Sequence, residues 1–205
     1  MAEVPEAVRA TLERAGDVPS AALDFLGRLD SEYFARVSPE DAARHAHLAA
    51  ELTPTRPARL GVEPRGEGRY DIVVVALDYF AEFALLCGLL AVHGLDIESG
   101  HVHTCAPAPP RPPRGVRRQP QPTPARKIVD IFRVRPRRGA PEAQTLEAEL
   151  VELLGLVTDG QGVEAREHLN RRLVESLERH SGSIEEALAP VEIEFENDPG
   201  SPWTI

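Results

Sequence analysis

The stretch "RYDIVVVALDYFAEFALLCGLLAVHGLDIESGHVHT", residues 69–104, decides the fold. Its residues 71–77 form a continuous, largely β-branched run, which predicts a strand buried on one or both faces. Residues 80–94 have the length and apolar spacing of a packed helix, and Gly94 is suited to its C′ position. Residues 95–104 alternate in polarity and predict a second strand. This stretch therefore predicts a strand, a helix and a second strand in succession.

The chain continues the same pattern after residue 104. Residues 127–136 alternate and predict a third strand, residues 141–157 and 164–180 predict two amphipathic helices, and residues 191–197 predict a half-exposed last strand. The order strand, helix, strand, strand, helix, extra helix, strand is typical of an α+β domain. We expect a ferredoxin-like βαββαβ fold, with an antiparallel sheet and helices on one face.

Other segments set the domain boundaries. Residues 1–53 predict a small helical segment, in which Ser38 can cap a helix that has Pro39 in its first turn. Residues 54–68 carry the proline and glycine of a linker. Residues 69–197 form the main predicted domain, and residues 105–127, with eight prolines and six basic residues, are an extended insertion within it.

Composition limits the function classes. The net charge of -10 argues against nucleic-acid binding, which needs a basic surface. Two cysteines in 205 residues make no disulfide framework and indicate a reducing cytoplasm. The first residues lack the features of a signal peptide, and the longest apolar run is about half of a bilayer span, so we expect a cytoplasmic protein without a membrane partner.

Several of these motifs resemble an ACT domain, a small regulatory module that senses amino acids. They are Asp78 at the end of the first strand, "GLDI" at 94–97, Thr104 closing the second strand, and "VDIFRV" at 129–134. With "YF" at 33–34 and "SPED" at 38–41, the chain resembles the first ACT region of the [protein-PII] uridylyltransferase family. Residues 198–205 are similar to that family's junction into a second ACT domain. The resemblance covers roughly residues 30–205.

The resemblance implies a regulatory role in nitrogen signalling. Its expected effector is glutamine, and its expected partners are a second copy of the chain or a second ACT domain, with a PII-type protein as a further possibility. The family's nucleotidyltransferase and His-Asp phosphohydrolase motifs are not found in this sequence, so we expect neither a catalytic residue nor a cofactor. Two alternatives stay open: an ACT fold that acts only in docking or dimerisation, and a fragment of an active nucleotidyltransferase.

The expected ligand site is the corner after the first strand. In ligand-binding ACT domains this corner reads Asp-x-Pro-Gly, and its glycine lets backbone N–H groups approach a carboxylate. Here the corner is Asp78, Tyr79, Phe80, Ala81 and Glu82. Phe80 replaces the proline, Ala81 replaces the glycine, and Glu82 adds a negative charge that repels an anion. These departures favour a degenerate corner in which Tyr79 and Phe80 pack on a partner or on the N-terminal helices.

The histidines and cysteines suggest no stronger site. His101, His103 and Cys105 share one strand face by the two-residue period, but their spacing matches no standard zinc pattern. We expect them on an exposed polar face, opposite Val102 in the core. His45 and His47 lie two residues apart on a helix, so we expect solvated positions and no metal. Cys87, among helical leucines, is expected to be a core residue.

Overall fold

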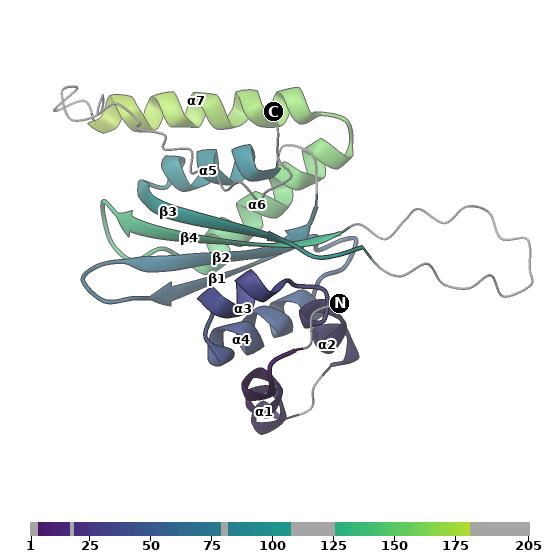
Figure 1. The fold of residues 1–205 in the computed structure, drawn as a ribbon. Coiled ribbons are helices and arrows are strands. Elements are labelled where there is room, and N and C mark those ends of the chain that lie inside the picture. Colours follow the sequence, from purple (N-terminus) through teal and green to yellow (C-terminus); the bar gives the residue numbers. More distant parts are fainter. Residues whose placement is uncertain (1–3, 17–18, 79–81, 108–125, 181–205) are drawn as a thin grey trace, which may run out of the picture.

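The computed structural model describes residues 4–16, 19–78, 82–107 and 126–180 as a four-stranded sheet with helices on both faces (Figure 1). The strands are β1 (Ala58–Pro64), β2 (Tyr70–Leu77), β3 (Leu95–Thr104) and β4 (Lys127–Pro136). All neighbouring strands are antiparallel, and their order across the sheet is β1-β2-β4-β3. The predicted α+β class with an antiparallel sheet is therefore confirmed.

Two groups of helices cover the two faces of the sheet. Helices α5 (Glu82–Val92), α6 (Ala143–Thr158) and α7 (Gly162–His180) lie on the upper face in Figure 1, and α7 packs over α5 and α6. Helices α1 (Glu6–Ala15), α2 (Ser20–Leu26), α3 (Ser31–Arg36) and α4 (Pro39–Ala50) lie on the lower face. Helices α5–α7, which belong to the predicted domain, lie together on one face, and the N-terminal helices, predicted as a separate segment, pack on the other face.

The alternation of β2 side chains explains why both faces are covered. Ile72, Val74 and Ala76 belong to the core under α5–α7. Val73 and Val75 belong to a second core, shared with Phe25, Tyr33 and other residues of α1–α4. A strand that is apolar on both sides must bury both sides, since exposing either row would forfeit about 1.5–3 kcal/mol per large aliphatic side chain.

A glycine sets the close approach of α7 to α5. A Cβ atom added at Gly88 of α5 would lie closer to Cδ2 of Leu169 in α7 than two carbon atoms can pack. Leu169 is buried, so the absence of a side chain at position 88 lets the two helices pack in contact. Helix α7 thus packs on α5 and α6, with Leu169 next to Gly88 of α5.

Residues 54–68, predicted as a linker, instead contain β1. This strand pairs with β2 from Ala58 opposite Ala76 to Pro64 opposite Tyr70, and Ala58 and Leu60 are buried. The apolar alternation of Ala58, Leu60 and Val62 explains the strand, although Gly61 and Pro64 interrupt the usual strand composition. In a ferredoxin-like sheet the last strand would pair at this edge, which β1 occupies. The predicted strand at 191–197 lies outside the described residues.

The two edges of the sheet differ in how their backbones are satisfied. At the β1 edge, the Leu60 N–H donates to Oε2 of Glu147 in α6 at 2.9 Å, and Arg56 and Arg59 form ion pairs with the same carboxylate. At the β3 edge, residues 96 to 102 are all exposed. Within the described residues no side chain is seen to hydrogen-bond the β3 backbone as Glu147 does for β1. Within the part of the chain that the structure describes, α6 therefore covers the β1 edge, and no element covers the β3 edge.

Local signals for two helix ends are confirmed. Ser38 Oγ accepts a hydrogen bond from the Asp41 N–H at 3.1 Å and donates to Oδ2 of the same residue at 2.7 Å, so Ser38 caps α4 as predicted. Gly94 has φ of 67°, the left-handed conformation that ends α5.

None of the described helices combines the length and apolar character needed to cross a bilayer.

Candidate functional site

The predicted ligand corner is described only in part. Asp78 is exposed, and its N–H donates to the Arg126 carbonyl at 2.7 Å. Tyr79, Phe80 and Ala81 lie outside the described residues, as does the side chain of Glu82, the first residue of α5. The predicted role of this corner therefore stays a prediction.

Asp130 is a buried carboxyl group close to this corner that the sequence reasoning did not single out. It lies on β4 between Val74 of β2 and Val102 of β3, on the same face as Ile128 and Phe132. Its side chain is 0% exposed, and neither oxygen has a hydrogen-bond partner among the described residues. Burial first, and then the charge of Asp78, raise the pKa of Asp130 to about 7.

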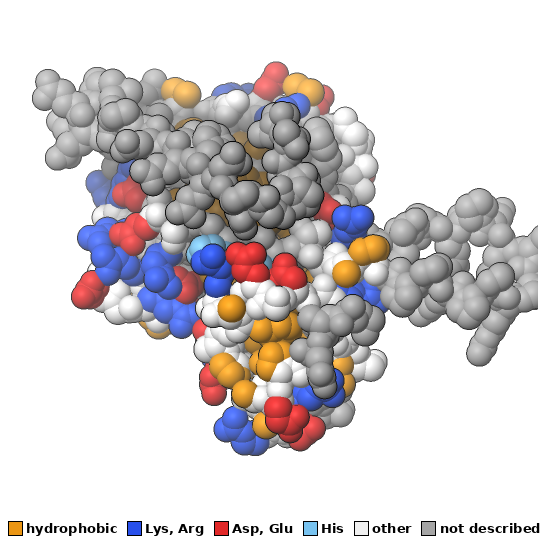
Figure 2. Space-filling view, viewed as in Figure 1, with side chains coloured by type: hydrophobic (Ala, Val, Ile, Leu, Met, Phe, Trp, Pro, Cys, Tyr) orange, Lys and Arg blue, Asp and Glu red, His pale blue; other side chains and the backbone are white. Residues whose placement is uncertain are grey.

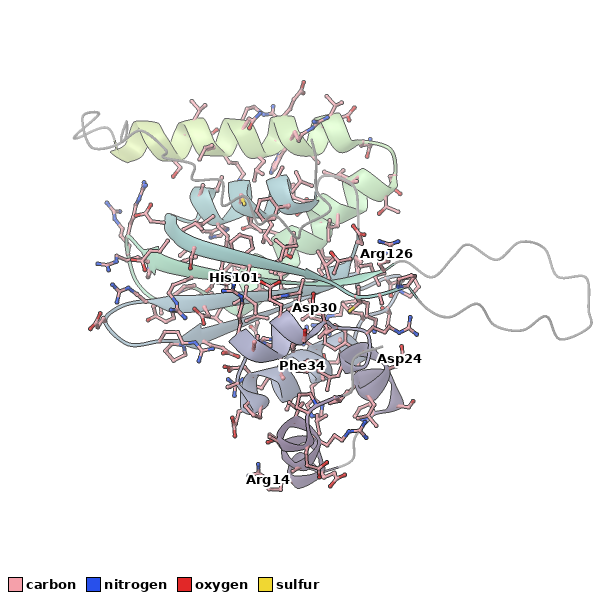
Figure 3. All side chains as sticks on the ribbon, viewed as in Figure 1. Arg14, Asp24, Asp30, Phe34, His101 and Arg126 are labelled. Carbon is pink, nitrogen blue, oxygen red and sulfur yellow. The ribbon has the colours of Figure 1, made fainter. Side chains whose placement is uncertain are left out.

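A polar pocket lies on the other face of the sheet, where α3 and α4 meet the strands. Its volume is about 280 Å³. In Figure 2 histidine atoms are visible beside basic and acidic side chains at the level where the lower helices meet the sheet, and Figure 3 places His101 where α3 meets the sheet. The pocket is lined by Arg36, Val37, Asp41, His45, Arg65, Asp71, Val73, Ser99, His101, His103, Ile131 and Arg133.

The sheet side of this pocket is organised by Asp71, which is 4% exposed. Arg133 donates to it through Nε at 2.9 Å and through Nη2 at 3.2 Å. Arg65 donates to it through Nε at 2.6 Å and reaches Asp41 of α4 through Nη2 at 3.1 Å. Arg65 thus links the β1–β2 hairpin and the sheet to the helical layer by charge-assisted hydrogen bonds.

The helical side is organised by Asp41, which is 8% exposed. It accepts hydrogen bonds from Ser38, Arg65 and Arg44, and Arg44 also donates to Glu63 of β1 at 2.8 Å. Burial acts to raise the pKa of Asp41, but the hydrogen bond from Ser38 and the nearby arginines outweigh it, so its pKa is lowered. This carboxyl is therefore ionised at neutral pH.

Two buried histidines complete the pocket. Nδ1 of His45 lies 2.8 Å from the hydroxyl oxygen of Tyr33, and the ring of Tyr33 meets the ring of His103 edge-on at 5.2 Å. Burial lowers the pKa of His45 to about 4 and also lowers that of His103. Both rings are therefore neutral at pH 7, and Nε2 of each has no partner among the described residues.

These positions correct the expectations for the histidine and cysteine side chains. His45 is 1% exposed, so its predicted solvated position is wrong. His101 is exposed, but His103 and Cys105 are buried at 6% and 2% exposure, so only part of the predicted polar face is exposed. Val102, predicted to lie in the core, is 52% exposed. Cys87 is half-buried against the α5–α7 core.

The described lining of the pocket consists mainly of charged and hydrogen-bonding side chains. Arginines, carboxylates and histidines make up its polar part, together with the hydroxyl of Ser99 on exposed β3. Among the described residues no group of three or more His, Cys, Asp and Glu is arranged to hold a metal ion. Comparison with family models and with curated proteins finds no match for this chain.

Proposed function

We propose that this chain is a non-catalytic regulatory module of ACT type that acts by docking through β3 on a second copy of itself. The observation that carries the proposal is the open β3 edge. A ten-residue edge strand offers a row of backbone donors and acceptors, and pairing with another strand satisfies them. The covered β1 edge directs any such pairing to β3.

The side chains of β3 favour a second copy as the partner. A bulge between Ile97 and Ser99 shifts the register, so Ile97 lies opposite Val134 and Val102 opposite Asp130, on one face of the sheet. Ile97 and Val102 are 40% and 52% exposed. Two β3 strands can pair antiparallel so that Ile97 of each copy lies against Val102 of the other. The pairing then contains this contact twice and buries all four side chains. That register also sets Asp96 opposite His103. Such a self-complementary contact is expected of a twofold dimer.

An amino acid is the proposed effector, with glutamine expected from the resemblance to the PII uridylyltransferase family. Asp130 supports an effector with an ammonium group. Its buried carboxyl has no hydrogen-bond partner among the described residues, and such a group gains most from a cationic hydrogen-bond donor. Its closeness to Asp78 adds a second negative charge on the same side. The role in nitrogen regulation and the PII-type partner rest on the resemblance alone.

Sedimentation velocity over a range of protein concentrations tests the docking. We expect a dimer whose dissociation constant rises at least about tenfold in Val102→Lys, because a lysine would be placed against Ile97 of the other copy. Val163→Lys is the matched control, since Val163 is 57% exposed on α7, away from β3. A monomer at all concentrations, or equal weakening by both variants, contradicts the proposal.

Thermal melting with each amino acid tests the effector. A ligand at 100 times its dissociation constant stabilises the fold by about 2.7 kcal/mol, and this response should disappear in Asp130→Leu. If no amino acid raises the melting temperature while the dimer persists, the chain is a docking module without an amino-acid effector.

A further inference from the structure

The pocket between α3, α4 and the sheet has more hydrogen-bond donors than acceptors. Both oxygens of Asp71 are occupied by Arg65 and Arg133, and both oxygens of Asp41 by Ser38, Arg44 and Arg65. A guanidinium carries five N–H donors. The carboxylates are thus already satisfied, whereas guanidinium N–H groups remain.

Arg133 and Arg36 carry these remaining donors. Arg133 uses Nε and Nη2 on Asp71, which leaves the donors of Nη1. Arg36 is seen to use only Nε, which donates to Glu32 at 3.2 Å between two exposed side chains. The described lining holds three arginines and two aspartates, so its arginines exceed its aspartates by one. Both features favour an anion in the pocket.

His45 adds a donor at the buried side. The only described contact of the Tyr33 hydroxyl is Nδ1 of His45, and burial raises the pKa of Tyr33 so that the hydroxyl keeps its proton. We assign the hydroxyl as the donor, because the reverse assignment would leave its hydrogen without an acceptor among the described residues. The imidazole proton then lies on Nε2, which has no described partner although the side chain is 1% exposed. A buried donor without an acceptor is unfavourable and would be relieved by a ligand oxygen.

We propose that this pocket binds a small oxyanion, a carboxylate or a phosphate group, which accepts hydrogen bonds from Arg36, Arg133 and His45. Its volume of about 280 Å³ is near the lower end of the range for ligand sites, about 300–1,000 Å³, and suits a small metabolite. Val37, Val73 and Ile131 supply an apolar wall for the carbon atoms of such a molecule. This site lies on the opposite face of the sheet from Asp130 and does not depend on the proposed docking through β3.

Isothermal titration with inorganic phosphate and with succinate tests this site, at an ionic strength held constant with sodium chloride. We expect saturable binding of at least one of the two, and the one that binds identifies the phosphate or the carboxylate as the group recognised. Arg36→Gln should weaken binding about tenfold or more, which is the effect of losing a charge-assisted hydrogen bond. This substitution leaves the pairs of Asp71 and Asp41 intact, so the fold should not change.

Arg133→Gln should weaken binding as well, and Arg135→Gln is its matched control. Arg135 lies on the same strand, is 52% exposed, pairs with Glu98 and does not line the pocket. In a protein with ¹⁵N-labelled histidine, the Nε2 resonance of His45 should shift as the anion binds. Absence of saturable binding by either anion overturns the proposal, as does equal affinity in Arg36→Gln, Arg133→Gln and Arg135→Gln. Binding of methylamine in place of the anions also overturns it, because it would identify a cation site.

Discussion

The two faces of the sheet bury charge-bearing groups in opposite ways. Under α3 and α4, Asp71 is held by Arg65 and Arg133, and the histidines are kept neutral. Under α5–α7, Asp130 is a buried carboxyl next to an apolar core and has no partner among the described residues. Among the described residues, the carboxyl on the first face is paired with arginines and the carboxyl on the second face has no partner. The contrast teaches that burial alone does not tell whether a polar group stabilises the fold.

The largest expected effect is on the pH dependence of the free energy of unfolding, to which the two faces of the sheet contribute with opposite signs. The pKa of Asp130 is raised from 3.8 to about 7, so the folded state holds more protons than the unfolded state and stability falls as pH rises from 4 to 7. Three pH units at about 1.4 kcal/mol each give about 4 kcal/mol. The pKa of His45 is lowered from 6.5 to about 4, so its contribution is present above pH 6.5 and is lost as pH falls to 4, about 3 kcal/mol.

Urea unfolding at pH 4 to 8 separates the two contributions. In the unaltered protein they largely cancel. In Asp130→Asn the free energy of unfolding should rise with pH. His103 contributes to this rise, because burial lowers its pKa too. In His45→Phe the free energy of unfolding should fall with pH. The slope is the measured quantity, so a uniform loss of stability does not affect the test. Equal slopes in the two variants would contradict the contrast between the faces.

The second effect comes from comparing an Asp→Asn substitution on the two faces, at Asp71 and at Asp130. Asp71→Asn should lower the free energy of unfolding by about 2 kcal/mol at pH 7, because it removes charge-assisted hydrogen bonds from Arg65 and Arg133, discounted for the exposure of both arginines. Asp130→Asn should raise it at pH 8. Denaturant unfolding of both variants measures the difference. If both substitutions change the free energy of unfolding in the same direction, the proposed contrast between the two faces is wrong.

The smallest expected effect is at the cap of α4. Ser38→Ala removes the acceptor for the Asp41 N–H and the donor to its carboxylate, and should cost about 1 kcal/mol. Ser31→Ala is a suitable control, since Ser31 is an exposed residue in the first turn of α3, whose cap is Asp30. Thermal unfolding should show a lower melting temperature for Ser38→Ala than for Ser31→Ala. Equal melting temperatures would show that the cap contributes nothing.

The sequence was a good guide to elements with a clear period. The β-branched run of β2, the apolar helix α5 and the Ser38 cap were all predicted from local pattern. Strand β1 was missed because Gly61 and Pro64 outweighed its apolar alternation. Whether a given side chain is buried, however, depends on tertiary contacts. His45 lies on the same helix as the buried residues Ala42, Ala46 and Ala49, and this apolar row could have predicted its burial.

The polar pocket could not be predicted from local pattern. Its residues come from α3, α4, the β1–β2 hairpin, β3 and β4, which are far apart in the chain and meet only because the N-terminal helices cover the second face of the sheet. Asp130 did carry a signal. It occupies the core-facing phase of the alternation Ile128, Asp130, Phe132 and Val134, where an acid is unexpected.

Lys127, the one lysine in the sequence, lies where the helical layer meets the sheet. Its Nζ donates to the Ala49 carbonyl near the end of α4 at 2.8 Å and lies 6.0 Å from the centre of the Phe25 ring. Burial also lowers its pKa. An amine-reactive acylating reagent thus has a single side chain to modify, and the rate of its modification reports how often the helices lift from β4. The reactivity of this one side chain therefore measures how tightly helices α1–α4 are held on the sheet.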